Sequence, residues 1–174
     1  MVDDLVLHSL RQVGLIAGAA TLIYAALHDV AARTIPHTTC AIVALIGLAL
    51  RLADGQVIFS LTVDVIVFVC CTLCWLRGWM GGGDVKLLTA AAVFVPPAAV
   101  GSMIISTTLF GGIVAVAYLV ARTIVRRIPP PNRAAPRNFL ARVLRAEHWR
   151  LLRGAPLPYG SAIAAGTLFT LFSG

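Results

Sequence analysis

The sequence predicts an all-α integral membrane protein with about six transmembrane helices. Hydrophobic residues make up 59% of its 174 residues and charged residues only 12%, whereas soluble domains are roughly 45–50% apolar. The mean hydropathy is +0.92. The apolar residues gather in six stretches, which we expect to form one transmembrane domain over residues 1–174: 13–27, 40–50, 57–76, 85–100, 103–121 and 157–172.

Several of these stretches are shorter than the roughly 20 residues that a helix needs to cross a bilayer. Flanking polar residues such as Gln12 and Thr38 are therefore expected to lie within the helices. A cleaved signal peptide fits the first stretch poorly, because Asp3 and Asp4 precede a lone Arg11 where a signal peptide would begin with basic residues.

The basic residues predict the orientation. The segment between the fifth and sixth stretches, about residues 122–156, contains a single acid, Glu147, and most of the arginines: Arg122, Arg126, Arg127, Arg133, Arg137, Arg142, Arg145, Arg150 and Arg153. By the positive-inside rule this loop is cytoplasmic. Counting the helices backwards places the turns at 29–39 and 77–86 on the same cytoplasmic face and both termini outside.

The net charge of +7 does not indicate nucleic-acid binding, because nearly all of the excess lies in this one loop, which also contains Pro129, Pro130 and Pro131. Such juxtamembrane loops normally fix topology and attract anionic lipid. We therefore expect membrane lipid as a partner and no nucleic acid. Residues 137–153 are expected to form an amphipathic helix on the membrane surface.

The cysteines carry no information about disulfides, and they do not predict a metal site. Cys70, Cys71 and Cys74 lie in the third stretch and Cys40 at the start of the second, where small polarizable side chains serve for packing. The spacing Cys71-x-x-Cys74 has no second such pair and no nearby histidine to complete a zinc site.

Two aspartates carry the functional prediction. Asp29 follows the first apolar stretch, and Asp84 closes the run Gly81-Gly82-Gly83-Asp84 just before the fourth. Ionisable groups at membrane depth are costly and usually functional, and the predicted topology places both on one face. Paired carboxylates that share one proton can activate water, so the leading hypothesis is proteolysis.

Each aspartate also has a simpler interpretation. Asp84 would be the N-cap of a helix after a glycine loop. Asp29 would form an ion pair with Arg33, four residues on. The glycines themselves would admit an extended substrate backbone, since glycine lacks a side chain and reaches conformations closed to other residues.

The motifs around these aspartates resemble those of type IV prepilin peptidases. Asp29 with the run from Arg33 through Ile35-Pro36-His37 resembles their Asp-x-x-x-x-x-Ile-Pro-Asn signature, and Gly81 to Leu87 matches Gly-x-Gly-Asp-x-Lys-Leu. Pro158-Tyr159-Gly160 resembles the start of the Pro-Tyr-Gly-x-x-x-Ala run that opens the family's last helix. The motifs occur in the family's order and extend over nearly the whole chain.

The resemblance implies a GxGD-type aspartic protease fold in which the catalytic pair is Asp29 and Asp84. It implies a single peptidase domain that cuts the basic leader from prepilins or pilin-like proteins at the cytoplasmic face of a bacterial or archaeal inner membrane. No metal or cofactor is implied. The residues that we expect to bind substrate are Gly81, Gly82, Gly83, Lys86 and Arg33.

Two features depart from the family pattern. His37 stands where the signature has asparagine. The segment after Asp29 also lacks the long insertion with paired Cys-x-x-Cys motifs that bifunctional members carry, so the chain resembles the short, peptidase-only branch of tight-adherence (Flp) and archaeal preflagellin peptidases. We therefore expect no N-methylation.

Two other classes of protein remain open. A signal-peptide-peptidase-like protease also uses Gly-x-Gly-Asp, but its first aspartate usually follows tyrosine, and here His28 precedes Asp29. A transporter would use Asp29, Asp64 and Asp84 as an ion relay, although no inverted repeat is apparent. The simplest role for Asp64 is a buried carboxyl bonded to Thr62 or to a neighbouring helix, or a carboxyl near the outer interface, where water reaches it.

Overall fold

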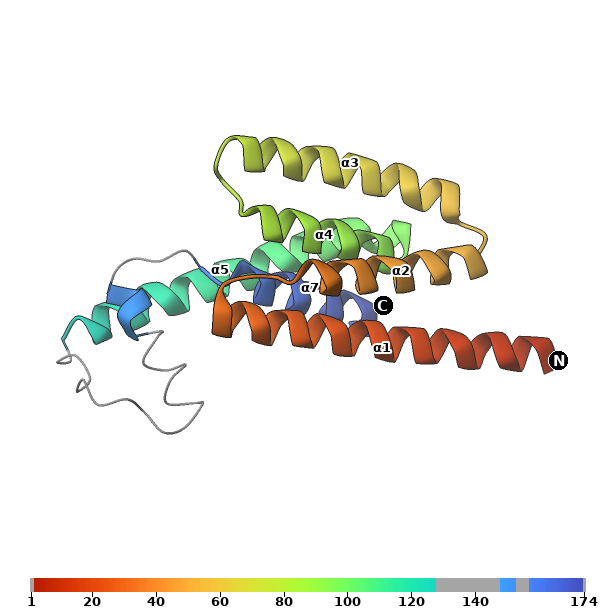
Figure 1. Ribbon diagram of the computed structural model, residues 1–174, viewed down its shortest axis with the longest axis horizontal. Helices are drawn as coiled ribbons and strands as arrows, with labels where there is room; N and C mark the ends of the chain where they lie inside the picture. The colour runs from red at the N-terminus through yellow and green to blue at the C-terminus, as the bar shows by residue number, and fades with distance from the viewer. Residues whose placement is uncertain (1, 128–147, 153–156, 174) are drawn as a thin grey trace. The chain divides into compact units, whose positions relative to one another are not determined.

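The computed structural model describes residues 2–127, 148–152 and 157–173, and every long regular element in them is helical (Figure 1). Most of the predicted basic loop, and most of the predicted helix at 137–153, lies outside the described residues. The elements are α1 (Val2–Ala32), α2 (His37–Ala53), α3 (Val57–Leu76), α4 (Gly82–Phe94), the short 3-10 helix η1 (Pro97–Ala99), α5 (Val100–Val125) and α7 (Tyr159–Ser173).

The chain divides into two compact units. The first unit comprises residues 1–110 and 158–174, and the second comprises residues 111–157. All the site residues described below belong to the first unit. A single peptidase domain remains a prediction.

Three segments are long and apolar enough to span a bilayer: Leu7–Ala32, Val57–Leu76 and Pro97–Val125. Large apolar side chains on them face outward, as Ile58 does with 85% of its surface exposed. Such a surface suits contact with lipid rather than with water. The chain is therefore a membrane protein, and the expectation of six spans remains a prediction for the shorter helices.

The fourth apolar stretch differs from the prediction. The residues 85–100 do not form one helix, because α4 ends at Phe94 and a break at Pro96 and Pro97 leads into η1. Proline donates no backbone hydrogen bond and disfavours the helical conformation of the residue before it. The 13 residues of α4 rise only about 20 Å.

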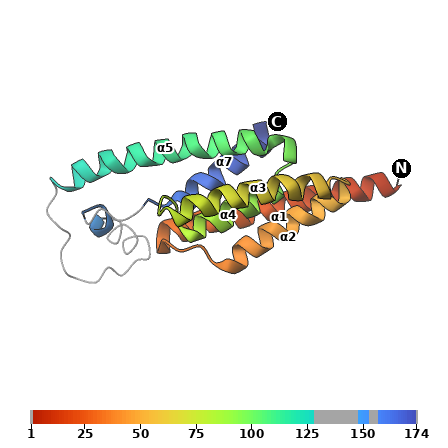
Figure 2. The same ribbon diagram turned by 90° about the horizontal axis from the view of Figure 1, so that it is seen from above.

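Within the first unit, α4 lies in the middle. It packs against α2, α3 and α7, while α1 packs against α2 and α7 (Figure 2). Small residues permit the close approach: a Cβ on Gly47 would come within 2.6 Å of the Phe94 backbone, and one on Gly18 within 2.3 Å of the Phe94 ring. Phe94 is fully buried as a result.

The connections divide this unit into two ends (Figure 1). The α1–α2 and α3–α4 connections lie at one end, where α7 also begins; we call this the site end (residues 33–36, 77–81 and 158). The α2–α3 and α4–α5 connections lie at the opposite end, the far end (residues 54–56 and 95–99).

Candidate active site

Asp29 is fixed by the first turn of α7. It lies in the last turn of α1, is only 6% exposed, and its Oδ2 accepts a hydrogen bond of 2.9 Å from the Gly160 amide. Gly160 is the second residue of α7, so its N–H has no partner within its own helix. The positive end of a helix dipole also favours a carboxylate. The start of α7 therefore holds the Asp29 carboxylate in place.

Asp84 is the third residue of α4, half-buried, and the N-cap of this helix is Gly81. The interpretation of Asp84 as the N-cap is therefore wrong. Its carboxylate instead takes a hydrogen bond from the Gly81 backbone, as the third helical residue does in a capping box. This contact orients the Asp84 side chain at the start of α4.

Three chain segments meet around Ile35. A Cβ on Gly83 would lie 3.6 Å from the Ile35 Cβ, and a Cβ on Gly160 would lie 3.0 Å from its Cδ1. Tyr159 lies close enough to Asp84 to be affected by its charge. The structure thus brings together the three motifs, which lie up to 131 residues apart in the sequence.

The two carboxyl groups act on each other. Burial, followed by the negative charge of Asp29, raises the pKa of Asp84 to about 6, although the Gly81 hydrogen bond acts in the opposite direction. A carboxyl with a pKa near neutrality can hold or release a proton at physiological pH. Two such interacting groups titrate as a pair, so the protonation of Asp84 depends on the charge of Asp29.

The run Gly81 to Gly83 provides space and does not adopt backbone angles closed to other residues. The expectation that these glycines are needed for such angles is therefore wrong. Gly81 is extended, with φ −73° and ψ 144°, and the glycines with positive φ are Gly55 and Gly78. A Cβ on Gly81 would come within 2.9 Å of the Asp84 Oδ2. Any larger residue at this position would therefore displace the carboxylate.

The two basic residues predicted to bind substrate also lie at the site end. Arg33 has φ 56°, and its N–H donates a 2.8 Å hydrogen bond to the Asp29 carbonyl, an αL-type helix end that is uncommon for residues other than glycine. Lys86 is exposed on α4, with its Nζ 3.4 Å from His37 Nδ1. His37, the departure from the family signature, therefore contacts the motif lysine.

The sequence argument did not include Gly160, Tyr159 and Ile35 among the site residues, although all three lie in the motifs that it used. A glycine in the first turn of the last apolar helix was the available signal, because only a residue without a side chain leaves room there for another group. The partner of its amide depends on the packing of α7 against α1, which the sequence does not specify.

Asp64 belongs to a different cluster. It is 5% exposed, and its Oδ2 accepts a 3.3 Å hydrogen bond from Ser60. The predicted partner Thr62 is wrong, because the Thr62 hydroxyl donates to the Ile58 carbonyl of its own helix. Asp64 precedes the end of α3 at Leu76 by 12 residues, which is about 18 Å of helix.

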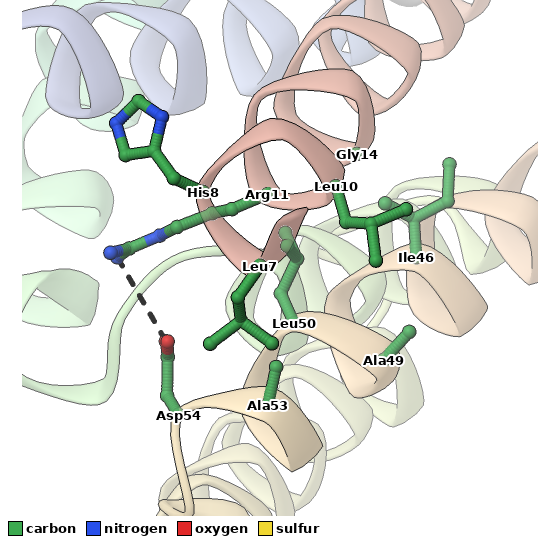
Figure 3. A pocket seen from close by; sticks show the side chains of 10 residues that line it. All are labelled: Leu7, His8, Leu10, Arg11, Gly14, Ile46, Ala49, Leu50, Ala53 and Asp54. Atoms are coloured by element: carbon green, nitrogen blue, oxygen red, sulfur yellow. Dashed lines mark ion pairs between the residues drawn. The ribbon is translucent and has the colours of Figure 1, made fainter. Parts of the chain in front are cut away.

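The cluster around Asp64 lies in the half of the unit nearer the far end. Arg51, with a side chain that is 3% exposed, forms a 3.0 Å ion pair with Asp54, and its charge also acts on Asp64. Figure 3 shows Arg11 and Asp54 on the wall of a pocket of about 510 Å³, joined by a weaker ion pair of 3.9 Å. This arrangement separates Asp64 from the two motif aspartates.

Comparison with known proteins identifies the family. The sequence model of the type IV leader peptidase family matches residues 16–119, a range that includes both Asp29 and Asp84. Neither the curated proteins nor the solved structures yield a match. Because the family match covers more than half of the chain, this protein belongs to the type IV leader peptidase family, which is a family of proteases.

Proposed function

We propose that this protein is an aspartic endopeptidase with a GxGD-type fold that removes the basic leader from prepilins or pilin-like proteins, without methylating the product. The observation that carries the proposal is the mutual influence of Asp29 and Asp84 at one end of a membrane protein, with the pKa of Asp84 at about 6. A proton shared between two carboxyl groups is what aspartic proteolysis requires.

The surroundings favour different roles for the two carboxyl groups. The Gly160 amide donates to Asp29, which favours the ionised form of this aspartate. Burial and the Asp29 charge favour the protonated form of Asp84. Asp29 would accept a proton from water, which attacks the scissile carbonyl, while Asp84 would hydrogen-bond the carbonyl oxygen and donate its proton as the C–N bond breaks.

The position of the pair suits a substrate that is part soluble and part membrane-bound. The pair lies where helices end, and a groove of about 280 Å³ beside it is lined by Met80, Leu88, Ile104 and Tyr159 among others. We propose that this groove receives the apolar segment of the substrate. The residues proposed to contact the peptide around the cut are Gly81, Gly82, Gly83, Lys86 and Arg33.

The proposal includes the predicted topology. Six spans in a single domain would leave both termini outside and the site end in the cytoplasm of a bacterial or archaeal cell, where a prepilin leader is found. A transporter that uses Asp29, Asp64 and Asp84 is less well supported, because Asp64 lies near Arg51 and about 18 Å of helix before the end of α3 at the site end.

Co-expression with a prepilin tests the proposal. The wild-type chain should shorten the prepilin on a gel, and Asp29→Asn and Asp84→Asn should each abolish this shift, because asparagine has nearly the same shape but cannot cycle a proton. Asp64→Asn is the matched control, being the same change at a buried aspartate of the far end, and it should retain cleavage. Substantial leader removal by either motif variant would refute the catalytic pair.

A further inference from the structure

A second groove lies on the other side of α4, between α2, α3 and α4. Its volume is about 360 Å³. Small side chains line it, including Ala41 and Ala44 of α2 and Ala90 of α4, and Phe68 of α3 forms a wall. Among the described residues that line it, Lys86 is the one with a full charge. The groove is therefore apolar and contains one cationic group, Lys86.

The helical spacing shows where that charge lies. Lys86, Ala90 and Val93 are spaced as neighbours along one face of α4, and Ala41 and Ala44 continue the face of α2 that begins at His37. Seven residues of helix rise about 10 Å. The groove thus runs from a polar mouth at the site end to the level where α2 and α4 come into backbone contact, at Gly47 and Phe94.

The mouth of the groove presents two basic side chains. Lys86 Nζ lies 3.4 Å from His37 Nδ1, and both residues are exposed. An ammonium group binds phosphate oxygens through charge-assisted hydrogen bonds. Such a mouth is complementary to an anion, and the apolar channel behind it is complementary to a hydrocarbon chain.

We propose that this groove binds one anionic phospholipid, with its phosphate at Lys86 and His37 and an acyl chain between α2, α3 and α4. Anionic lipids are abundant on the cytoplasmic side of membranes, which is where the proposed function places the site end. Because Lys86 lies two residues after Asp84, the bound lipid would steady the first turn of α4.

Labelling of Lys86 tests the proposal, since Lys86 is the only lysine in the sequence. The purified protein in detergent is treated with an amine reagent, and modification of the peptide that contains Lys86 is followed by mass spectrometry. Phosphatidylglycerol should slow modification at least threefold, whereas phosphatidylcholine and inorganic phosphate should not. Equal protection by phosphatidylcholine, protection by phosphate alone, or no protection by phosphatidylglycerol would overturn the proposal.

Variants test the binding of the lipid head group and of its acyl chain independently. Native mass spectrometry should show retained phosphatidylglycerol on the wild type and on Arg77→Met, which removes an exposed cation that lies over Trp79 outside the groove. Lys86→Met should lose the lipid, because it removes the charge that binds the phosphate. Ala41→Phe, at an exposed position, should lose it by filling the groove.

Two results would contradict the lipid site directly. Retention of the lipid by both Lys86→Met and Ala41→Phe would place it elsewhere. Protection of Lys86 by a peptide with the apolar segment of a prepilin, but not by phosphatidylglycerol, would assign the groove to the substrate. Neither assay measures cleavage, so failure of the lipid site and failure of the proposed peptidase activity can be told apart.

Discussion

The two ends of the first unit both contain buried acids, but the groups around these acids differ. At the far end, Arg51 forms an ion pair with Asp54, and the carboxyl of Asp64 accepts a hydrogen bond from Ser60. At the site end, the negative charge of Asp29 acts on Asp84. A buried carboxylate near a cation is typical of structural ion pairs, whereas two interacting carboxyls are typical of catalytic sites.

Asp64 lies within an apolar helix, whereas Asp29 and Asp84 lie in the last turn and the first turn of theirs. The acids toward the far end have a cationic or hydroxyl partner, so changes there should lower stability. Changes at the site end should lower the rate of cleavage. Each of the following predictions compares the cleavage rate with the stability of the same protein.

The largest effect outside the catalytic pair is expected for Arg51→Met. Removing a buried cation leaves its acidic partners uncompensated, which typically costs about 3 kcal/mol of unfolding free energy. Titration with sodium dodecyl sulfate in mixed micelles would measure this loss. The cleavage rate of the folded fraction should stay within about twofold, since changes at distant and independent sites seldom affect one another.

Arg11→Met is the matched control for this prediction. It removes the other arginine that pairs with Asp54, but at 3.9 Å and with its side chain 52% exposed, so the expected loss is below about 0.5 kcal/mol. Equal losses for the two variants would show that the burial of Arg51 does not matter. Loss of cleavage by folded Arg51→Met would show that the two ends are not independent.

The next effect in size is expected for Gly160→Ala. The new Cβ would lie 2.9 Å from the Asp29 Oδ2 and 3.0 Å from the Ile35 Cδ1, so the carboxylate must move. A small misplacement of a catalytic group is costly, and we expect kcat to fall at least about tenfold with KM nearly unchanged. Initial rates on a synthetic prepilin peptide would measure both constants.

Gly101→Ala is the control for Gly160→Ala, because a Cβ on Gly101 meets no atom within 4 Å. Its rate should equal that of the wild type. A Gly160→Ala enzyme with normal kcat would mean that the start of α7 does not position Asp29. A parallel loss of melting temperature and rate would assign Gly160 to folding alone.

The sequence predicted most of the helices, because these depend on local patterns, and it placed Asp29 and Asp84 at the same end of the bundle from the order of the helices. The third apolar stretch became α3 at the predicted bounds, 57–76. Helical spacing could also have predicted the hydrogen-bond partner of Asp64. Ser60 precedes Asp64 by four residues and lies on the same face of the helix, whereas Thr62 precedes it by two residues and does not.

Other features depended on tertiary packing. The contact between Gly160 and Asp29 joins residues 131 apart and exists only because α7 packs beside α1. The role of Asp84 as the third residue of α4, rather than its N-cap, depends on where the helix begins at Gly82. This shift of three residues, from an N-cap at Asp84 to one at Gly81, is beyond what residue preferences determine.

The smallest expected effect is the pH dependence of cleavage, which follows from the pKa of Asp84 at about 6. If Asp84 holds the shared proton, the rate should fall about fivefold between pH 6 and pH 7, as the protonated fraction decreases. Because its pKa is raised on folding, the stability contributed by Asp84 should decline from about pH 4 to about pH 6 and change little above that. A melting temperature that stays constant between pH 6 and pH 7 would therefore exclude unfolding as the cause. Rates that are constant or that rise over this interval would show that Asp84 does not supply the proton.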